Sequence, residues 1–247
     1  MAVFVTDEAL DYRDQATSFP PGSPFLLDEA YRRAHLPLVA PDHPGVIAAD
    51  PARGYRMGRH VAFWSLVIPV AWPLLAESPG FRTLDSALRN GPLAAKISWD
   101  MFDARKAVLH ATICGGLAQG TAPAIGPEER AALDGIRPFD VSIRGLFSGS
   151  VNCGRLYLRL YPERIDRENA IHSVQTVLGR PLTALYVLGL YNLVDDLRPD
   201  EAGWLAGLLD RFGDTPIAIQ RVDRLWLMGA RDDLALDSEV AEIVRLG

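Results

Sequence analysis

Hydrophobic and polar positions follow regular patterns along most of the chain after residue 60, and they predict a succession of strands and helices. The stretch VAFWSLVIPVAWPLLA, at 61–76, predicts a buried strand followed by a turn at its prolines. GRLYLRLYPE, at 154–163, alternates in the manner of a half-buried strand and would pair with FDVSIRGLFSG, at 139–149, across the turn SVNCG. Further strands are predicted at 108–115, 185–193, 217–229 and 237–247, and helices at 83–91, 126–136, 166–179 and 199–212.

The first 58 residues differ from the rest of the chain. They are dense in proline and glycine, as in FPPGSPFLL and HLPLVAPDHPG, and they contain one short helical candidate, LLDEAYRRA, with Asp28 as its N-cap. We therefore divide the chain into an N-terminal arm or lid, 1–58, and a single domain, 59–247.

The strand VLHATICG, at 108–115, carries two polar side chains among small and β-branched ones. His110 and Thr112 are two positions apart, and side chains at that spacing in a strand point to the same face. The spacing therefore predicts an imidazole and a hydroxyl side by side on one face of an apolar strand.

A weak duplication follows. LHATICG, at 109–115, can be placed over LYVLGLY, at 185–191, and each is followed by a helix that opens with proline and acidic residues and then by strands. In this register Tyr186 takes the place of His110, and Leu188 takes the place of Thr112.

Composition narrows the class of protein. The 247 residues, 49% of them hydrophobic, suffice for one large domain or two small lobes that fold alone, and a monomer is expected. The net charge is −6 and the basic residues are scattered, which argues against a long nucleic acid and leaves a small anionic ligand as the expected partner.

Cys114 and Cys153 give neither a metal spacing nor a disulfide framework, so no metal and no cofactor is expected. The apolar run at 61–76 is shorter than the roughly 20 residues of a membrane span, and the start of the sequence does not resemble a secretory signal. The expected location is the cytoplasm, with no membrane association.

Residues 96–247 resemble the 2H phosphoesterase superfamily, which includes RNA 2′,3′-cyclic phosphodiesterases and RNA ligase-like proteins. The residues that carry the resemblance are HAT at 110–112, the helix after it, the hairpin ending in GRLYLRLYPE and the terminal RVDRLWLMGARDD. The resemblance implies an α+β fold in which two similar lobes with antiparallel sheets face a central cleft, with helices outside. It also implies two His-x-Thr/Ser motifs that face each other across that cleft.

Such a pair suits metal-independent phosphodiester cleavage, because one imidazole removes a proton while the other protonates the departing oxygen. A hydroxyl on the same face stabilises charge on the phosphate. The sequence departs from this pattern at the second motif, where Tyr186 and Leu188 stand. A tyrosine, with a pKa of about 10, is a poor base at neutral pH, and His43 or His60 would have to supply a second imidazole.

Three hypotheses remain open. In the first, the protein is a weakened phosphodiesterase of small cyclic or linear nucleotides. His110 is its general base or acid, Thr112 donates a hydrogen bond to the phosphate, and Tyr186 is a degenerate partner that faces His110 across the cleft. In the second, it is an inactive module that binds a nucleotide or phosphate. In the third, the proline-rich arm is a protein-interaction surface.

Overall fold

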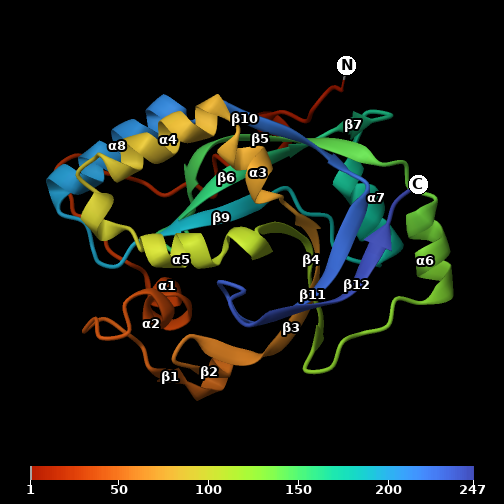
Figure 1. Cartoon of the computed structure of the whole chain (residues 1–247), viewed down its shortest axis with the longest axis horizontal. Helices are drawn as coiled ribbons and strands as arrows, with labels where there is room; N and C mark the ends of the chain where they lie inside the picture. Colours follow the sequence, from red (N-terminus) through yellow and green to blue (C-terminus); the bar gives the residue numbers. More distant parts are fainter. Residues whose placement is uncertain (1) are drawn as a thin grey trace.

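The computed structural model describes residues 2–247 and has an α+β fold, in which helices pack around one large antiparallel sheet (Figure 1). The helices are α1 (Glu29–Ala34), α2 (Leu36–Val39), α3 (Trp72–Ala76), α4 (Pro79–Arg89), α5 (Trp99–Ala104), α6 (Pro127–Asp134), α7 (Ala170–Val177) and α8 (Pro199–Phe212). The strands are β1 (Ala49–Asp50), β2 (Tyr55–Arg56), β3 (Arg59–Pro69), β4 (His110–Gln119), β5 (Phe139–Ser148), β6 (Arg155–Pro162), β7 (Arg164–Ile165), β8 (Glu168–Asn169), β9 (Val187–Asn192), β10 (Pro216–Val222), β11 (Arg224–Asp232) and β12 (Ser238–Arg245).

The large sheet has ten strands in the order β1-β2-β3-β4-β9-β6-β5-β10, and β11 pairs with both β3 and β12. The stretch predicted as one strand at 217–229 is split by Asp223 into β10, which pairs with β5, and β11, which pairs with β3. One segment of chain therefore borders two distant parts of the sheet. Because all ten strands belong to one sheet, the two sheets expected from the sequence are joined.

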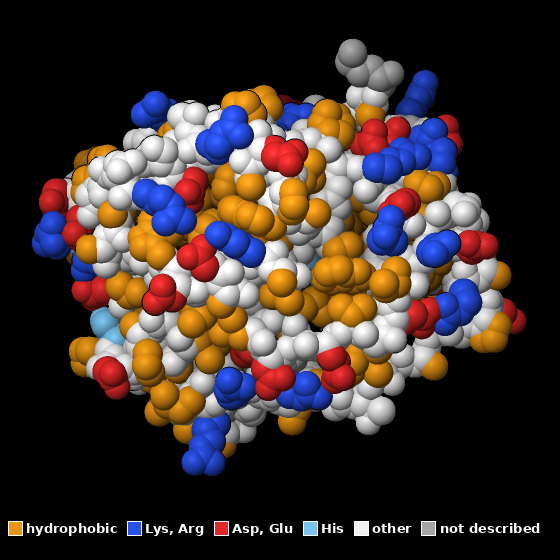
Figure 2. Space-filling view, in the orientation of Figure 1, with side chains coloured by type: hydrophobic (Ala, Val, Ile, Leu, Met, Phe, Trp, Pro, Cys, Tyr) orange, Lys and Arg blue, Asp and Glu red, His pale blue; other side chains and the backbone are white. Residues whose placement is uncertain are grey.

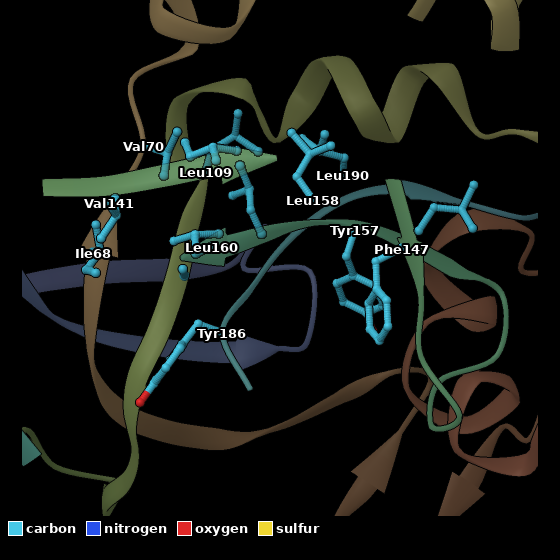
Figure 3. Packing of buried hydrophobic residues seen from close by; sticks show 14 of the residues in the cluster. Ile68, Val70, Leu109, Val141, Phe147, Tyr157, Leu158, Leu160, Tyr186 and Leu190 are labelled. Carbon is cyan, nitrogen blue, oxygen red and sulfur yellow. The ribbon is translucent and has the colours of Figure 1, made fainter. Parts of the chain in front are cut away.

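The register of β3, β4 and β11 separates an inner face from an outer one. Leu66 on β3, Leu227 on β11 and Ala111 on β4 are almost completely buried and alternate with residues of the opposite face. The inner face forms the main core together with β5, β6 and β9, part of which is shown in Figure 3. The outer face of β3, β4 and β11 carries the candidate site.

The helices predicted within 59–247 are found as α4, α6, α7 and α8, the first three with different ends, whereas α3, where a turn was expected, and α5 were not predicted. Helix α4 begins four residues earlier than expected, because the Ser78 hydroxyl caps it by accepting from the Phe81 amide over 3.2 Å. Helix α7 begins later, because residues 164–169 form the small β7–β8 hairpin and Asn169 then caps the helix. Within residues 2–247 no helix is both long and apolar enough to cross a membrane.

The N-terminal arm packs closely against the domain. Tyr12 and Phe25 lie in the main core, and the Tyr12 hydroxyl donates to the Leu160 carbonyl over 2.6 Å. Asp28 caps α1 as predicted, accepting from the Tyr31 amide over 2.7 Å. The arm thus contributes core side chains from its first helix and from the extended chain before it.

Candidate functional site

His110 and Thr112 lie on the outer face of β4, as the two-residue spacing predicts. His110 is paired with Pro69 and Thr112 with Val67 across the β3–β4 ladder, so all four side chains share one face. Ala111, between them, points the other way into the core. The His110 ring is partly buried and Thr112 is exposed.

These two residues line a pocket of about 150 Å³ between β3, β4, β11 and the loop after β11. Its apolar wall includes Val67 and Met228. Its polar lining comes from segments that are far apart in the sequence: His60, Ser65, His110, Thr112, Asp232 and Asp233. The pocket therefore brings a second imidazole and two carboxylates to the predicted motif.

The His110 imidazole is held in one tautomer. Its Nδ1 lies 2.7 Å from the Val108 carbonyl, and since a carbonyl can only accept, Nδ1 carries the proton and Nε2 carries a lone pair. Burial lowers the pKa of His110 to about 4, and the positive charges of Arg105 and Arg155 act in the same direction against the hydrogen bond to Val108. At neutral pH His110 is thus an unprotonated base.

His60 is in the opposite state. Its Nδ1 lies 2.7 Å from the Val61 carbonyl and its Nε2 lies 3.2 Å from Asp233 Oδ1, so both nitrogens face acceptors. Burial by itself lowers the pKa of His60, but the bonds to Asp233 and to the Val61 carbonyl outweigh it, and the pKa is raised. Burial likewise opposes the charge on Asp233, yet bonds from His60 and Tyr55 bring the pKa of Asp233 down to about 2.

Two arginines lie close enough to the pocket for their charges to act on His110, although neither lines it. Arg105 is 1% exposed, and its guanidinium donates to the carbonyls of Leu234 over 2.7 Å and Gly189 over 2.9 Å. Arg155 donates to the Asp233 carbonyl over 2.9 Å. Among the described residues, no carboxylate lies within 4.0 Å of either guanidinium.

The carboxylates that line the pocket do not form ion pairs with these two guanidiniums. The Asp232 carboxylate binds the loop after β11, because it accepts hydrogen bonds from the backbone amides of Leu234, Leu236 and Asp237. The pocket itself is lined by His60 and two carboxylates, Asp232 and Asp233, and the two guanidiniums lie outside its lining. Guanidiniums without carboxylate partners close to a partly buried site favour an anion there.

Tyr186 does not face His110, which corrects the geometry expected from the sequence. Strands β4 and β9 are neighbours, with Ala111 directly opposite Leu188, so Tyr186 shares the inner face with Ala111 and Leu188. Tyr186 is fully buried, donates its hydroxyl proton to the Thr183 carbonyl and accepts from Asn169 over 3.2 Å. Figure 3 shows it with other side chains of the main core.

The residues of β9 that do share the face of His110 and Thr112 are Val187 and Gly189. The sequence register that placed Tyr186 over His110 is therefore shifted by one residue, and a shift of one reverses every side chain in a strand. A side chain at Gly189 would meet the Arg155 guanidinium, which occupies that space. At this place the second repeat has a glycine covered by an arginine instead of a hydroxyl residue.

The sequence analysis missed Arg105, Arg155 and Asp233, and it offered His60 only as one of two histidines that might supply an imidazole. His60 and Asp233 are 173 positions apart, and no periodic pattern links them. The pairing of β3 with both β4 and β11 places them together. The stretch RMGRH, at 56–60, which leads into the start of β3, gives no sign that His60 is enclosed.

Comparison with known proteins does not assign the chain to a family. No protein-family model matches the sequence, and no curated protein matches it. Within residues 2–247, no group of three or more His, Cys, Asp and Glu side chains is arranged to hold a metal ion. The function is therefore inferred from the geometry and charge of the pocket.

Proposed function

We propose that the protein is a phosphodiesterase-like protein that acts, without a metal ion, on a small cyclic or linear nucleotide phosphodiester. The observation that carries this proposal is the conjunction of the His110 lone pair and the Thr112 hydroxyl in one small pocket, with two guanidiniums without carboxylate partners close enough for their charges to act on His110. Each group corresponds to a need of phosphodiester chemistry: a base, a hydrogen-bond donor to phosphate, and positive charge.

The size of the pocket supports a phosphoryl group as its occupant. Its volume of about 150 Å³ is well below the roughly 300–1,000 Å³ of sites that enclose a whole drug-sized ligand. A phosphate group fits such a space while the rest of the molecule lies outside. The nearby charges of Arg105 and Arg155 favour the same occupant.

In the proposed reaction, His110 Nε2 takes a proton from a water molecule or a hydroxyl, whose oxygen then bonds to phosphorus as the bond to the leaving oxygen breaks. The leaving oxygen takes up a proton from solvent water. Thr112 donates to a non-bridging oxygen and offsets the charge that develops on it. A base with a pKa of about 4 is weak in the free protein. The negative charge of a bound phosphodiester beside the ring raises that pKa toward the range in which proton transfer is efficient.

In this proposal, β4 and β9 belong to the two lobes that the resembled family would have. These strands meet about the Ala111–Leu188 pair, and each is the first strand of one proposed repeat. The first repeat then contributes His110 and Thr112, and the second contributes the backbone of Gly189 with Arg155 over it. The cleft between the lobes corresponds to the outer face on which the pocket lies.

A second candidate function is an inactive module that binds a nucleotide or phosphate. It is favoured by the lack of an acid–base group at Val187 and Gly189, and by His60, whose two ring protons are both engaged with protein acceptors. Removing one general acid or base commonly costs about 10²- to 10⁴-fold in rate. A pocket of this kind would keep its affinity for phosphate and lose most turnover.

The test compares hydrolysis of 2′,3′-cyclic nucleotides by the wild type, His110→Ala, Thr112→Val and the matched control His172→Ala, whose imidazole lies on α7 outside the pocket. Enzymatic function predicts losses of at least about 100-fold in the first two variants and none in the control. Calorimetric titration with nucleoside monophosphates separates the two candidates. Binding without turnover supports the inactive module, and the absence of both rejects any phosphate role for the pocket.

A further inference from the structure

An apolar groove of about 810 Å³ adjoins the small pocket on the outer face of the sheet. It lies between α3 and strands β10, β11 and β12, and Trp72, Ile219, Trp226 and Ile243 are among its lining residues. Ile219 and Ile243 are 60% and 56% exposed. Figure 2 shows hydrophobic side chains gathered around this part of the surface, near α3 and along β11 and β12.

The register of the sheet makes the groove and the pocket one surface. Pro69 lines the groove and is directly opposite His110, which lines the pocket. Trp226 lines the groove and is directly opposite Val67, which lines the pocket and is itself opposite Thr112. Directly opposite residues have Cβ atoms about 4.5–5.5 Å apart. One molecule can therefore reach both places across the width of a single side chain.

The two parts differ in size and chemistry in complementary ways. The pocket is small and carries most of the polar groups, with two guanidiniums nearby, whereas the groove is mainly apolar and has the volume of a typical small-molecule site. The charged side chains along the groove are largely engaged: Lys106 with Asp103 over 2.5 Å, and Arg224 with Asp223 over 2.8 Å. The groove thus suits an uncharged group, and the pocket suits the anion attached to it.

Flat surfaces line the groove. Trp226 is half-buried and stands between Val67 and Ile243, its direct neighbours on β3 and β12, so its indole is supported from both sides. Pro69 and Pro73 add two rigid rings. An aromatic ligand ring gains from stacking on an indole that is already held in place, because little side-chain entropy is lost.

We propose that the groove binds an uncharged planar ring of the same phosphate ester whose phosphoryl group enters the pocket, with Trp226 as the stacking surface. This inference rests on the proposed function for the phosphoryl end of the ligand and assigns the other end. The substrate class is then an ester whose ring lies one side chain's width from the phosphate. Because the lining is mainly apolar, the ring is selected by its shape more than by hydrogen bonds.

The experiment titrates the full-length protein with inorganic phosphate, methyl phosphate, hexyl phosphate and phenyl phosphate, and measures Kd by calorimetry. The wild type should bind phenyl phosphate roughly tenfold more tightly than methyl phosphate, the size expected for one stacked ring. Trp226→Leu keeps apolar bulk and should remove this preference, whereas Trp226→Phe should keep most of it. Both variants should bind inorganic phosphate as the wild type does, and so should the surface control Leu182→Ala.

Three results would overturn the inference. Equal Kd values for hexyl and phenyl phosphate in the wild type would mean that the groove selects apolarity and not a planar ring. Equal Kd values for phenyl and methyl phosphate would leave the phosphate pocket standing and remove the ring site. A dimer in sedimentation that Trp226→Leu dissociates would make a second copy of the chain the occupant.

An uncharged probe keeps the failure of the ring site distinct from failure of the proposed function. Adenosine carries a planar ring and no phosphate, and its binding should quench tryptophan fluorescence in the wild type and not in Trp226→Leu. If adenosine quenches while none of the four phosphates binds, the proposed phosphate function fails and the ring site remains. If adenosine does not quench and the phosphates bind alike, the ring site fails and the phosphate pocket remains.

Discussion

His60 Nε2 lies 3.2 Å from Asp233 Oδ1 and joins the start of β3 to the loop after β11. The His60 side chain is only 2% exposed, and its Nδ1 is bound to the Val61 carbonyl. Two acceptors require two ring protons, so the pair consists of an imidazolium and a carboxylate. This ion pair forms one wall of the pocket opposite the neutral His110.

Replacing Asp233 with asparagine should destabilise the protein, because it leaves the enclosed imidazolium without its counter-charge. We expect a loss of about 1–3 kcal/mol in the free energy of unfolding, measured by urea denaturation at pH 6. The matched control is Asp237→Asn, which removes a more exposed carboxylate paired with Arg59 and should cost less than about 1 kcal/mol. Equal effects of the two substitutions would show that the pair contributes no more than a surface contact.

The contribution of this pair should also depend on pH. Because the pKa of His60 is raised in the folded state, its stabilising effect is complete below the unfolded pKa of about 6.5 and is lost as pH rises through the folded pKa. The pKa of Asp233 is lowered to about 2, so its effect is present above the unfolded pKa of about 3.9 and is lost as pH falls toward 2. The wild type should therefore exceed His60→Gln in stability most clearly between those two unfolded values. If the stability difference between the wild type and His60→Gln were the same at pH 6 and pH 9, the raised pKa of His60 would be contradicted.

The neutral state of His110 should be visible by titration. Burial and the charges of Arg105 and Arg155 hold the pKa of His110 at about 4, so its ring resonances should shift near that pH in an NMR titration of the free protein. Arg155→Met removes one of the lowering charges and should move the midpoint upward, whereas Arg155→Lys should retain most of the shift. Addition of inorganic phosphate should also move it upward. A midpoint near 6.5 in the wild type would refute the enclosed, positively charged pocket.

The sequence predicts those parts of the site that depend on residues close together along the chain, and not those that depend on remote segments. The alternation of β4 predicts that His110 and Thr112 share a face, because that signal lies within three residues. The apolar pattern at 185–193 predicts the strand that is found as β9, but the register that placed Tyr186 over His110 is off by one position, because LYVLGLY is apolar throughout and hydrophobicity does not distinguish its two faces. His60, Arg105 and Arg155 come from separate segments, so only the strand order brings them together.

The buried His35 should make the protein sensitive to acid. His35 is fully buried, its ring lies 5.1 Å from that of Tyr31, and neither ring nitrogen has a hydrogen-bond partner among the described residues. Burial and the charge of Arg155 lower the pKa of His35 to about 3. The unfolded chain then binds a proton that the folded chain does not, so stability falls as pH drops from about 6.5 toward 3, by about 1.4 kcal/mol per pH unit.

His35→Phe should remove this part of the acid sensitivity while keeping a ring against Tyr31. We expect the variant to be at least as stable as the wild type at pH 7, because a buried polar group without a partner is replaced by an apolar one. It should also lose less stability than the wild type between pH 6 and pH 4, as measured by urea denaturation at each pH. Parallel curves for the two proteins would show that His35 takes up its proton as readily in the folded state as in the unfolded one.

Gly189 provides a test of the register between β4 and β9. Its φ is not positive, so an alanine is compatible with the backbone, but the added Cβ would meet the Arg155 guanidinium. Gly189→Ala should therefore cost about 1–3 kcal/mol through overpacking. In an Arg155→Ala background the same substitution should cost almost nothing, because the space is then free, and the double-mutant cycle should give a coupling of at least about 1 kcal/mol. A cost that is the same in both backgrounds would mean that Arg155 does not cover Gly189, and the second repeat would then present a bare backbone to the pocket.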